Sequence, residues 1–146
     1  MGTRDEIEHL RTRIKKRSGL ADEPPAVEAG PKISEDDAES LLEFSRQLDL
    51  LNSKYTDYRH LKLLRHCVIM AEQVGGLADA LESREAAEEV VVWINTERDT
   101  PEFSEETNQD YRVALRIFGK RTLKLADDEV PESLAWIPTG TSNSYD

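Results

Sequence analysis

Apolar residues recur every three or four positions along most of this chain, the spacing that places them on one face of an α-helix. No stretch alternates between apolar and polar residues strongly enough to indicate a β-strand. The run EEVVVWI, over residues 88–94, is the one ambiguous segment. Alanines and glutamates surround it and favour a helix. The pattern therefore predicts an all-α fold, a bundle of four main helices with flanking segments.

Residues that commonly begin and end helices mark the limits of these four helices. Ser34 and Ser83 stand at predicted N-caps, and Ser34 is followed by three acidic residues that suit the positive end of a helix dipole. Gly75 and Gly76 form a predicted C-cap, and Pro101 ends a further helix. The predicted helices cover residues 34–51, 55–74, 84–99 and 105–123.

The segments outside these helices have a different composition. Within residues 1–18, Ile7, Leu10 and Ile14 have the spacing of a short amphipathic helix or a weak coiled coil. Residues 19–32 are rich in Pro, Gly and Ala and are predicted to be a linker. Residues 33–124 are predicted to form the helical domain. Residues 125–146 return to turn-forming residues and are predicted to be an extended tail or linker.

Several classes of protein and site are excluded by simple counts. The 146 residues suit one domain plus tails, and no apolar run approaches the ~18 residues of a membrane span. The N-terminus lacks the apolar region of a secretory signal. Cys67 is the only cysteine, and the three histidines lack metal-ligand spacing. We therefore expect a cytoplasmic protein with no metal, cofactor, membrane partner or small-molecule substrate.

The charge of the chain is unevenly distributed. Thirty acidic residues outweigh nineteen basic ones, for a formal net charge of −11, which by itself argues against an anionic partner. Such a balance is typical of proteins from a high-salt cytoplasm, so a halophilic source is one hypothesis. Yet residues 54–66 carry +3 and residues 107–124 carry +4. Both segments lie on predicted helices.

Helical wheels place this positive charge on the sides opposite the apolar faces. The helix over 105–123 buries Tyr111, Ala114, Leu115 and Phe118, and its polar face carries Gln109, Arg112, Arg116 and Lys120. The helix over 55–74 buries a face that includes His60, predicted to be a core histidine, and Cys67. Each polar stripe is either a solvated surface or a site for an anionic ligand. Its length of roughly 15 Å would suit a DNA groove.

Both cationic helices also begin at a threonine, Thr56 or Thr107. A hydroxyl and free backbone N–H groups at the positive end of a helix dipole can bind a phosphate oxygen. Taken on its own, each threonine is better explained as an ordinary N-cap than as a phosphate site.

The helix over 105–123 reads S-x-x-T-x6-A-L-R-x-F, from Ser104 to Phe118, and the helix over 55–74 opens with Ser53-x-x-Thr56. This resembles the N-terminal core-binding domain of tyrosine recombinases and phage integrases, in its haloarchaeal style, over residues 33–124. The resemblance implies a SAM-like orthogonal bundle of four helices. In that family the module forms half of a clamp around the recombination site.

Carried over by position, the resemblance implies that two helices contact double-stranded DNA, with arginine and lysine on phosphates and amides able to reach base edges. It also implies possible self-association on DNA through recombinase assembly. The predicted DNA-binding residues are Thr56, Arg59, Lys62, Arg65, His66, Thr107, Asn108, Gln109, Arg112, Arg116 and Lys120.

The catalytic set of the family has no counterpart in this sequence. There is no His-x-x-Arg motif, and Tyr145 lies in a Ser/Asn-rich tail that resembles the connector before the catalytic domain. The resemblance thus implies a fragment of an integrase, or a stand-alone product, that does not cleave DNA by itself and is not an enzyme. The alternative is a helical protein-interaction domain that does not bind DNA, with the helix over 4–17 as a dimerising arm.

Overall fold

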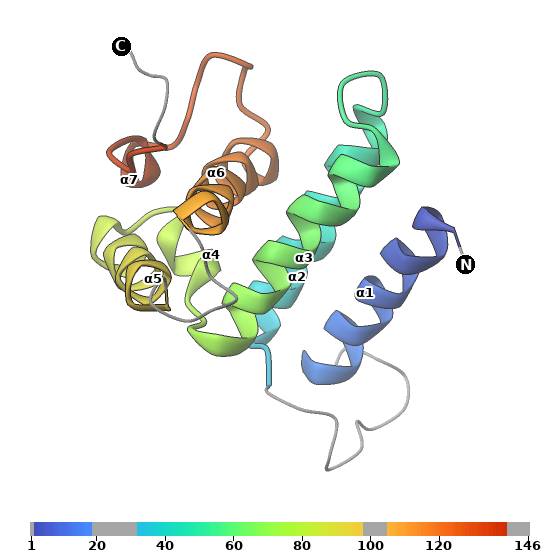
Figure 1. Ribbon diagram of the computed structural model, residues 1–146, viewed down its shortest axis with the longest axis horizontal. Coiled ribbons are helices and arrows are strands. Elements are labelled where there is room, and N and C mark those ends of the chain that lie inside the picture. The colour runs from blue at the N-terminus through green and yellow to red at the C-terminus, as the bar shows by residue number, and fades with distance from the viewer. Residues whose placement is uncertain (1, 19–31, 98–104, 140–146) are drawn as a thin grey trace.

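Helices account for all of the regular secondary structure in the part of the chain that the structure describes. The computed structural model describes residues 2–18, 32–97 and 105–139. Within these ranges it contains seven helices and no strand, so the all-α prediction is confirmed. The SAM-like arrangement remains a prediction. The helices are α1 (Thr3–Ser18), α2 (Glu35–Leu50), α3 (Asp57–Gln73), α4 (Leu77–Ala80), α5 (Arg84–Glu97), α6 (Glu105–Thr122) and α7 (Glu132–Ala135) (Figure 1).

The helix ends follow local capping chemistry. The side chains of Ser34, Thr56 and Ser83 each accept a hydrogen bond from the backbone N–H three residues later, at 3.1, 3.2 and 3.2 Å. After α3, Gly75 and Gly76 adopt φ angles of +80° and +74°, a region that residues with a Cβ rarely occupy. The predicted starts of α2 and α5 and the predicted end of α3 are therefore confirmed.

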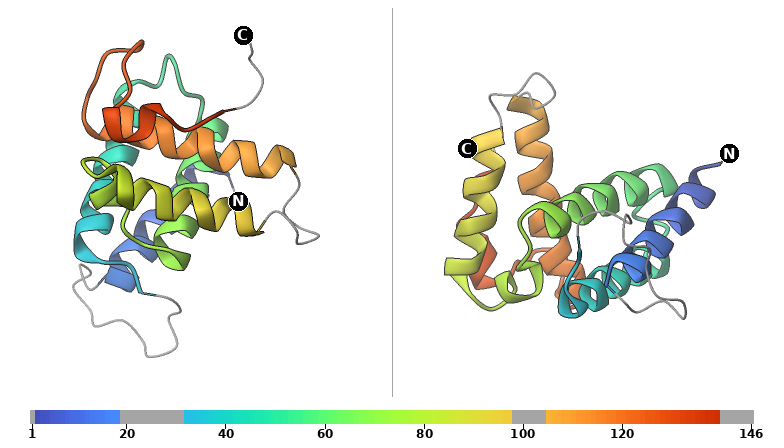
Figure 2. Two further views of the ribbon diagram at one scale, coloured as in Figure 1. Left: turned by 90° about the vertical axis from the view of Figure 1, so that its left-hand side faces the viewer. Right: turned by 90° about the horizontal axis from the view of Figure 1, so that it is seen from below.

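The helix α3 is the centre of the bundle. It packs against α1 on one side, against α6 on another, and against α2 behind it (Figure 1). The short helix α7 packs against both α5 and α6, as Figure 2 shows. Because α3 is covered from several directions, Leu63 and Met70 are buried in addition to the predicted face that contains His60 and Cys67.

The N-terminal helix α1 is part of the same hydrophobic core. Ile7 and Ile14 are fully buried and Leu10 nearly so, as its amphipathic pattern predicts for one packed face. The backbone N–H of Ile33 donates to the carbonyl of Arg17 at 3.0 Å, which joins the end of α1 to the start of α2. The predicted boundary between residues 1–18 and the domain is therefore not a boundary in packing, and the apolar face of α1 is not free to act as a dimerising arm.

Two carboxylates from α2 and α3 fasten α1 to the bundle, and each accepts from two arginines. Asp49 lies at the end of α2, and the side chain of Glu72, near the end of α3, is only 2% exposed. A buried carboxylate needs such partners because its desolvation is costly. The pairs are Arg4 and Arg11 with Asp49, and Arg13 and Arg17 with Glu72.

The segment over 125–139 also belongs to the fold, which corrects the prediction of an extended tail. Leu134 and Ile137 are buried, and Leu134 packs over Gly119 of α6. A Cβ at position 119 would collide with Cδ1 of Leu134 and lie 3.0 Å from Cγ of Pro131. The missing side chain of Gly119 therefore allows this segment to lie directly on the backbone of α6. Residues 140–146 lie outside the described residues.

No helix in the described ranges has the length and apolar character needed to cross a bilayer. In the same part of the chain, no three or more His, Cys, Asp or Glu side chains are grouped so that they could hold a metal ion together.

Candidate nucleic-acid interface

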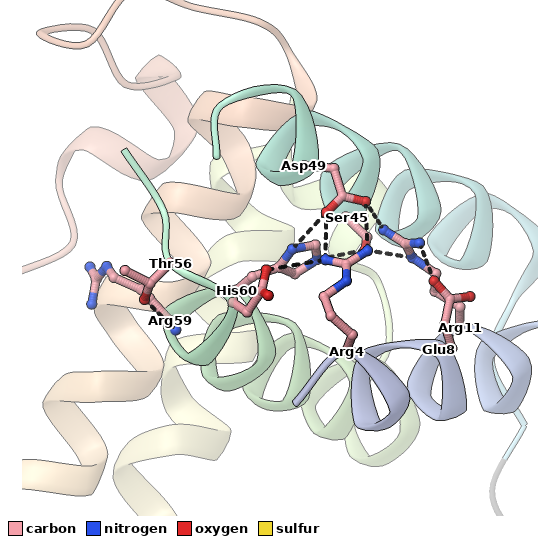
Figure 3. A network of polar contacts seen from close by, with 9 residues as sticks. Arg4, Glu8, Arg11, Ser45, Asp49, Thr56, Arg59 and His60 are labelled. Atoms are coloured by element: carbon pink, nitrogen blue, oxygen red, sulfur yellow. Dashed lines mark hydrogen bonds and ion pairs between the residues drawn. The ribbon is translucent and has the colours of Figure 1, made fainter. Parts of the chain in front are cut away.

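Of the two predicted cationic stripes, the one on the outward face of α3 is the more exposed to solvent. Tyr58 is 70% exposed, and Arg59 beside it is exposed as well. Figure 3 shows Arg59 at the N-terminal end of α3, beside the cap residue Thr56. Among the described residues, the guanidinium of Arg59 has no hydrogen-bond or ion-pair partner. It is therefore a cation available to a ligand at the predicted position.

The next two cations of α3 form ion pairs with the flanking helices. Nζ of Lys62 lies 3.2 Å from Oδ2 of Asp110 on α6, and a guanidinium nitrogen of Arg65 lies 3.4 Å from Oε1 of Glu6 on α1. All four side chains are between 35% and 49% exposed. Ion pairs this exposed are worth about 0–1 kcal/mol, so another anion can replace the carboxylates.

His66 lies at the edge of this face and differs from its neighbours in charge. Its ring packs edge-on against Tyr111 at a centroid distance of 4.3 Å, and Tyr111 packs in turn against Trp93 at 5.9 Å. Burial lowers the pKa of His66 below its usual range, although Asp110 opposes the change. At neutral pH His66 is therefore uncharged, and it can contribute a hydrogen bond but no positive charge.

The predicted cationic stripe of α6 is covered, which corrects the expectation of an open surface. Arg116 donates to the carbonyl of Ile137 at 3.0 Å, and Lys120 donates to the carbonyl of Asp127 at 2.6 Å. Both acceptors belong to the C-terminal segment that packs on α6. These two side chains hold that segment in place, and the C-terminal segment occupies the side of α6 on which a duplex was predicted to lie.

The neighbouring Arg121, which the sequence places beside the stripe, points into the protein. It is 6% exposed, donates to the Tyr55 hydroxyl at 3.0 Å and pairs with Asp127 at 2.5 Å. Much of the positive charge counted on 107–124 is thus used inside the fold.

The four predicted contacts at the start of α6 are less open than those of α3. Asn108 is 3% exposed, and its side-chain amide donates to the carbonyl of Ile94 and to the side chain of Asn95, both at 3.2 Å. A side chain held this way cannot reach a base edge without breaking both bonds, so the prediction for Asn108 is wrong. The other three are half-buried and already interact within the chain: Thr107, Gln109 and Arg112.

A polar network that the sequence did not reveal connects α1, α2 and α3 beneath the outward face (Figure 3). Oγ of Ser45 lies 2.7 Å from Nε2 of His60, whose Nδ1 lies 3.4 Å from Oδ1 of Asp49. This order of residues is that of a hydrolase triad, but Ser45 is fully buried and accepts from Nε of Arg11 at 2.9 Å. The network therefore fixes the packing of the three helices.

The two titratable members of this network have strongly shifted pKa values. Burial lowers the pKa of His60 to about 4, so it is neutral in the folded protein at pH 7. Burial alone would raise the pKa of Asp49, but hydrogen bonds from Arg4 and Arg11 outweigh it and hold the value at about 2. The prediction that His60 is a satisfied core histidine is confirmed.

A different side of the molecule is acidic. Two adjoining hollows of about 690 and 500 Å3 open over α2, α4 and α5. Six carboxylates in their walls have no cation beside them among the described residues, so anions would be repelled here. They belong to Asp36, Glu39, Asp79, Glu82, Glu85 and Glu89.

Comparison of the chain with family models, with curated proteins and with solved structures finds no match.

Proposed function

We propose that this chain is a DNA-binding module, with the role that the core-binding domain has in a tyrosine recombinase, and that α3 carries the contact. The observation behind the proposal is the outward face of α3. It presents Arg59, Lys62 and Arg65 within two helical turns, in a chain whose net charge is −11. We call this set, with Thr56 and Tyr58, the α3 face.

The α3 face has the dimensions and chemistry that a duplex requires. Six residues separate Arg59 from Arg65, a distance of roughly 9 Å along the helix axis. An α-helix fits into the major groove of B-DNA, and guanidinium and ammonium groups neutralise phosphates without regard to sequence. Tyr58 adds an exposed hydroxyl, and aromatic rings and hydroxyls are common at such interfaces. His66 would contribute at the edge as a neutral group.

In this proposal α6 has a supporting role. Arg116 and Lys120 anchor the C-terminal segment, and Asn108 is buried, so these three are removed from the proposed contact set. Asp110, in the second turn of the helix, faces Lys62. The helix thus borders the α3 face and determines which cations remain accessible.

The test is binding of the whole chain to a fluorescent 30-base-pair duplex of random sequence, followed by anisotropy between ~50 and ~200 mM KCl. The variant is Arg59→Ala with Arg65→Ala. Because two phosphate contacts are lost, we expect affinity to fall about tenfold or more. We also expect the slope of log K against log salt to become shallower by roughly 1.8, about 0.9 per contact.

The control is Arg46→Ala, which removes one exposed arginine from α2. Arg46 pairs with Glu43, one of the residues around the larger acidic hollow, so it is not part of the α3 face. If the double variant bound duplex as tightly as the control, the α3 face would not be the DNA contact. No duplex binding by the wild-type chain would favour the alternative, a protein-interaction domain.

A further inference from the structure

The α3 face is flanked by one carboxylate on each side. Glu6 approaches from α1 and pairs with Arg65, whereas Asp110 approaches from α6 and pairs with Lys62. Asp110 is the only acidic residue between positions 107 and 124. The single acid of a cationic segment is thus placed against a cation of the neighbouring helix.

These two carboxylates differ from those that hold the fold together. Glu72 is buried and is bound by two arginines, so its charge is part of the packing of α1. The side chains of Glu6 and Asp110 are 45% and 35% exposed, and each meets one partly exposed cation. Such pairs add little to stability. Glu6 and Asp110 therefore act mainly by lowering the positive electrostatic potential of the α3 face.

We propose that Glu6 and Asp110 are selectivity residues that lower the affinity of the α3 face for duplex DNA of arbitrary sequence. In the free protein the two carboxylates form ion pairs with Lys62 and Arg65, and a DNA phosphate has to displace them from these cations. After displacement each carboxylate remains close to the phosphate and repels it. This inference rests on the proposed function, and it predicts that phosphate contacts alone bind weakly, which leaves tight binding to depend on further contacts with a particular site.

The expected size of the effect follows from Coulomb interaction at the surface. Two unit charges roughly 5 Å apart in water repel enough to weaken binding about fourfold. Two such carboxylates would together weaken it by roughly an order of magnitude if their effects add. Because the Debye length falls to about 3 Å at 1 M salt, the effect should shrink as salt rises.

The experiment compares variants that change net charge equally. Glu6→Gln with Asp110→Asn removes both carboxylates and keeps the shape of the side chains. The control is Glu85→Gln with Glu89→Gln, two exposed positions on α5 that line the smaller acidic hollow. Each is titrated with the same 30-base-pair random duplex at ~50 mM KCl, by anisotropy. We expect the first variant to bind about tenfold more tightly than wild type, and the control less than twofold more tightly.

Two results would overturn the inference in distinguishable ways. If wild type binds the duplex but Glu6→Gln with Asp110→Asn binds no more tightly than the α5 control, the two carboxylates are not selectivity residues and the proposed function stands. If no form binds the duplex, the proposed function and this inference both fail. If the double variant loses its helical circular dichroism, the two single substitutions are tested in its place. We expect each of them to tighten binding about fourfold.

Discussion

The helices α3 and α6 have similar sequence patterns but different surroundings. Both have an apolar face, an opposite row of cations and few acidic residues. The row on α3 faces outward, and its ion pairs involve partly exposed carboxylates of neighbouring helices. The row on α6 lies under the C-terminal segment and donates to its backbone carbonyls. A cationic stripe thus indicates which side of a helix avoids its main core, and it does not say what covers that side.

The difference matters because water or another anion replaces an exposed carboxylate more easily than a backbone carbonyl as the partner of a cation. An exposed carboxylate that loses its cation is solvated by water at little cost. A carbonyl in a packed segment that loses its donor is left poorly solvated, which costs about 1–3 kcal/mol. The same residue types therefore serve a surface on α3 and a tertiary joint on α6. The following predictions test that contrast, from the largest effect to the smallest.

The largest effect is expected at the contact between the C-terminal segment and α6. Leu134 is fully buried over Gly119, so Leu134→Ala should lower the free energy of unfolding by about 3 kcal/mol, within the 2–5 kcal/mol typical of such cavities. Urea denaturation followed by circular dichroism measures this change. If the segment were a free tail, the substitution would leave the midpoint unchanged.

A double-mutant cycle sharpens the same point. Gly119→Ala alone should destabilise the protein, because its Cβ would collide with Leu134, despite the better helix propensity of alanine. In the Leu134→Ala background the collision is removed, and Gly119→Ala should become neutral or stabilising. Additive effects of the two substitutions would show that position 119 and Leu134 are not in contact.

The inner side of α3 is expected to respond to acid. Because the pKa of His60 falls from 6.5 in the unfolded chain to about 4 in the folded protein, the unfolded chain binds more protons between these values. The contribution of His60 to stability is therefore complete above pH 6.5 and is lost as pH falls to about 4, by up to roughly 3 kcal/mol. Asp49 and Asp57 oppose this shift, whereas Arg4 and Arg11 reinforce it.

The direct measurement is the titration of the His60 imidazole by NMR between pH 3 and 8. We expect a midpoint near 4. A midpoint near 6.5 would mean that His60 is open to water and that the network with Ser45 and Asp49 is not formed in solution.

A matched pair of substitutions compares the two cationic rows directly. Arg116→Met keeps an unbranched side chain but removes the donor to the carbonyl of Ile137, and we expect a loss of about 1 kcal/mol in unfolding free energy. Lys62→Met removes an exposed ion pair with Asp110, and the expected loss is below about 0.5 kcal/mol. Equal losses from the two would contradict the distinction between α6 and α3.

The smallest effect on stability is expected at Arg59, whose guanidinium has no partner among the described residues. Arg59→Ala should leave the free energy of unfolding within about 0.5 kcal/mol of wild type, because surface substitutions of this kind rarely do more. A larger loss in thermal or urea denaturation would indicate that Arg59 contributes to the fold and is not a free cation of the α3 face.

Much of the fold could be predicted because its signals are local. The caps at Ser34 and Ser83 and the paired glycines after α3 act within a few residues, and the structure has them where they were expected. The interior position of His60 followed from helix geometry alone. The SAM-like arrangement, the recombinase resemblance and the halophilic source stay predictions.

The rest could not be predicted, because it depends on residues far apart in the chain. The burial of α1 requires Asp49 and Glu72, both distant in sequence from the arginines they bind. The accessible part of the candidate site was predicted on α3, yet Asn108 was assigned to DNA although Ile94 and Asn95 hold it inside. Gly119 in the last turn of α6 and the apolar pair Leu134 and Ile137 were the signals that could have indicated a packed C-terminal segment.

By itself, the sequence determined the five long helices, α1, α2, α3, α5 and α6, and the main apolar side of each, because apolar spacing at 100° per residue repeats within a few turns. Tertiary structure alone decided which of two similar cationic rows stays accessible. That outcome depends on which distant segment packs against a helix, and at Gly119 the absence of a side chain lets Leu134 and its neighbours cover α6. The same residue types therefore ended as a surface on α3 and as a partly buried joint between α6 and the C-terminal segment.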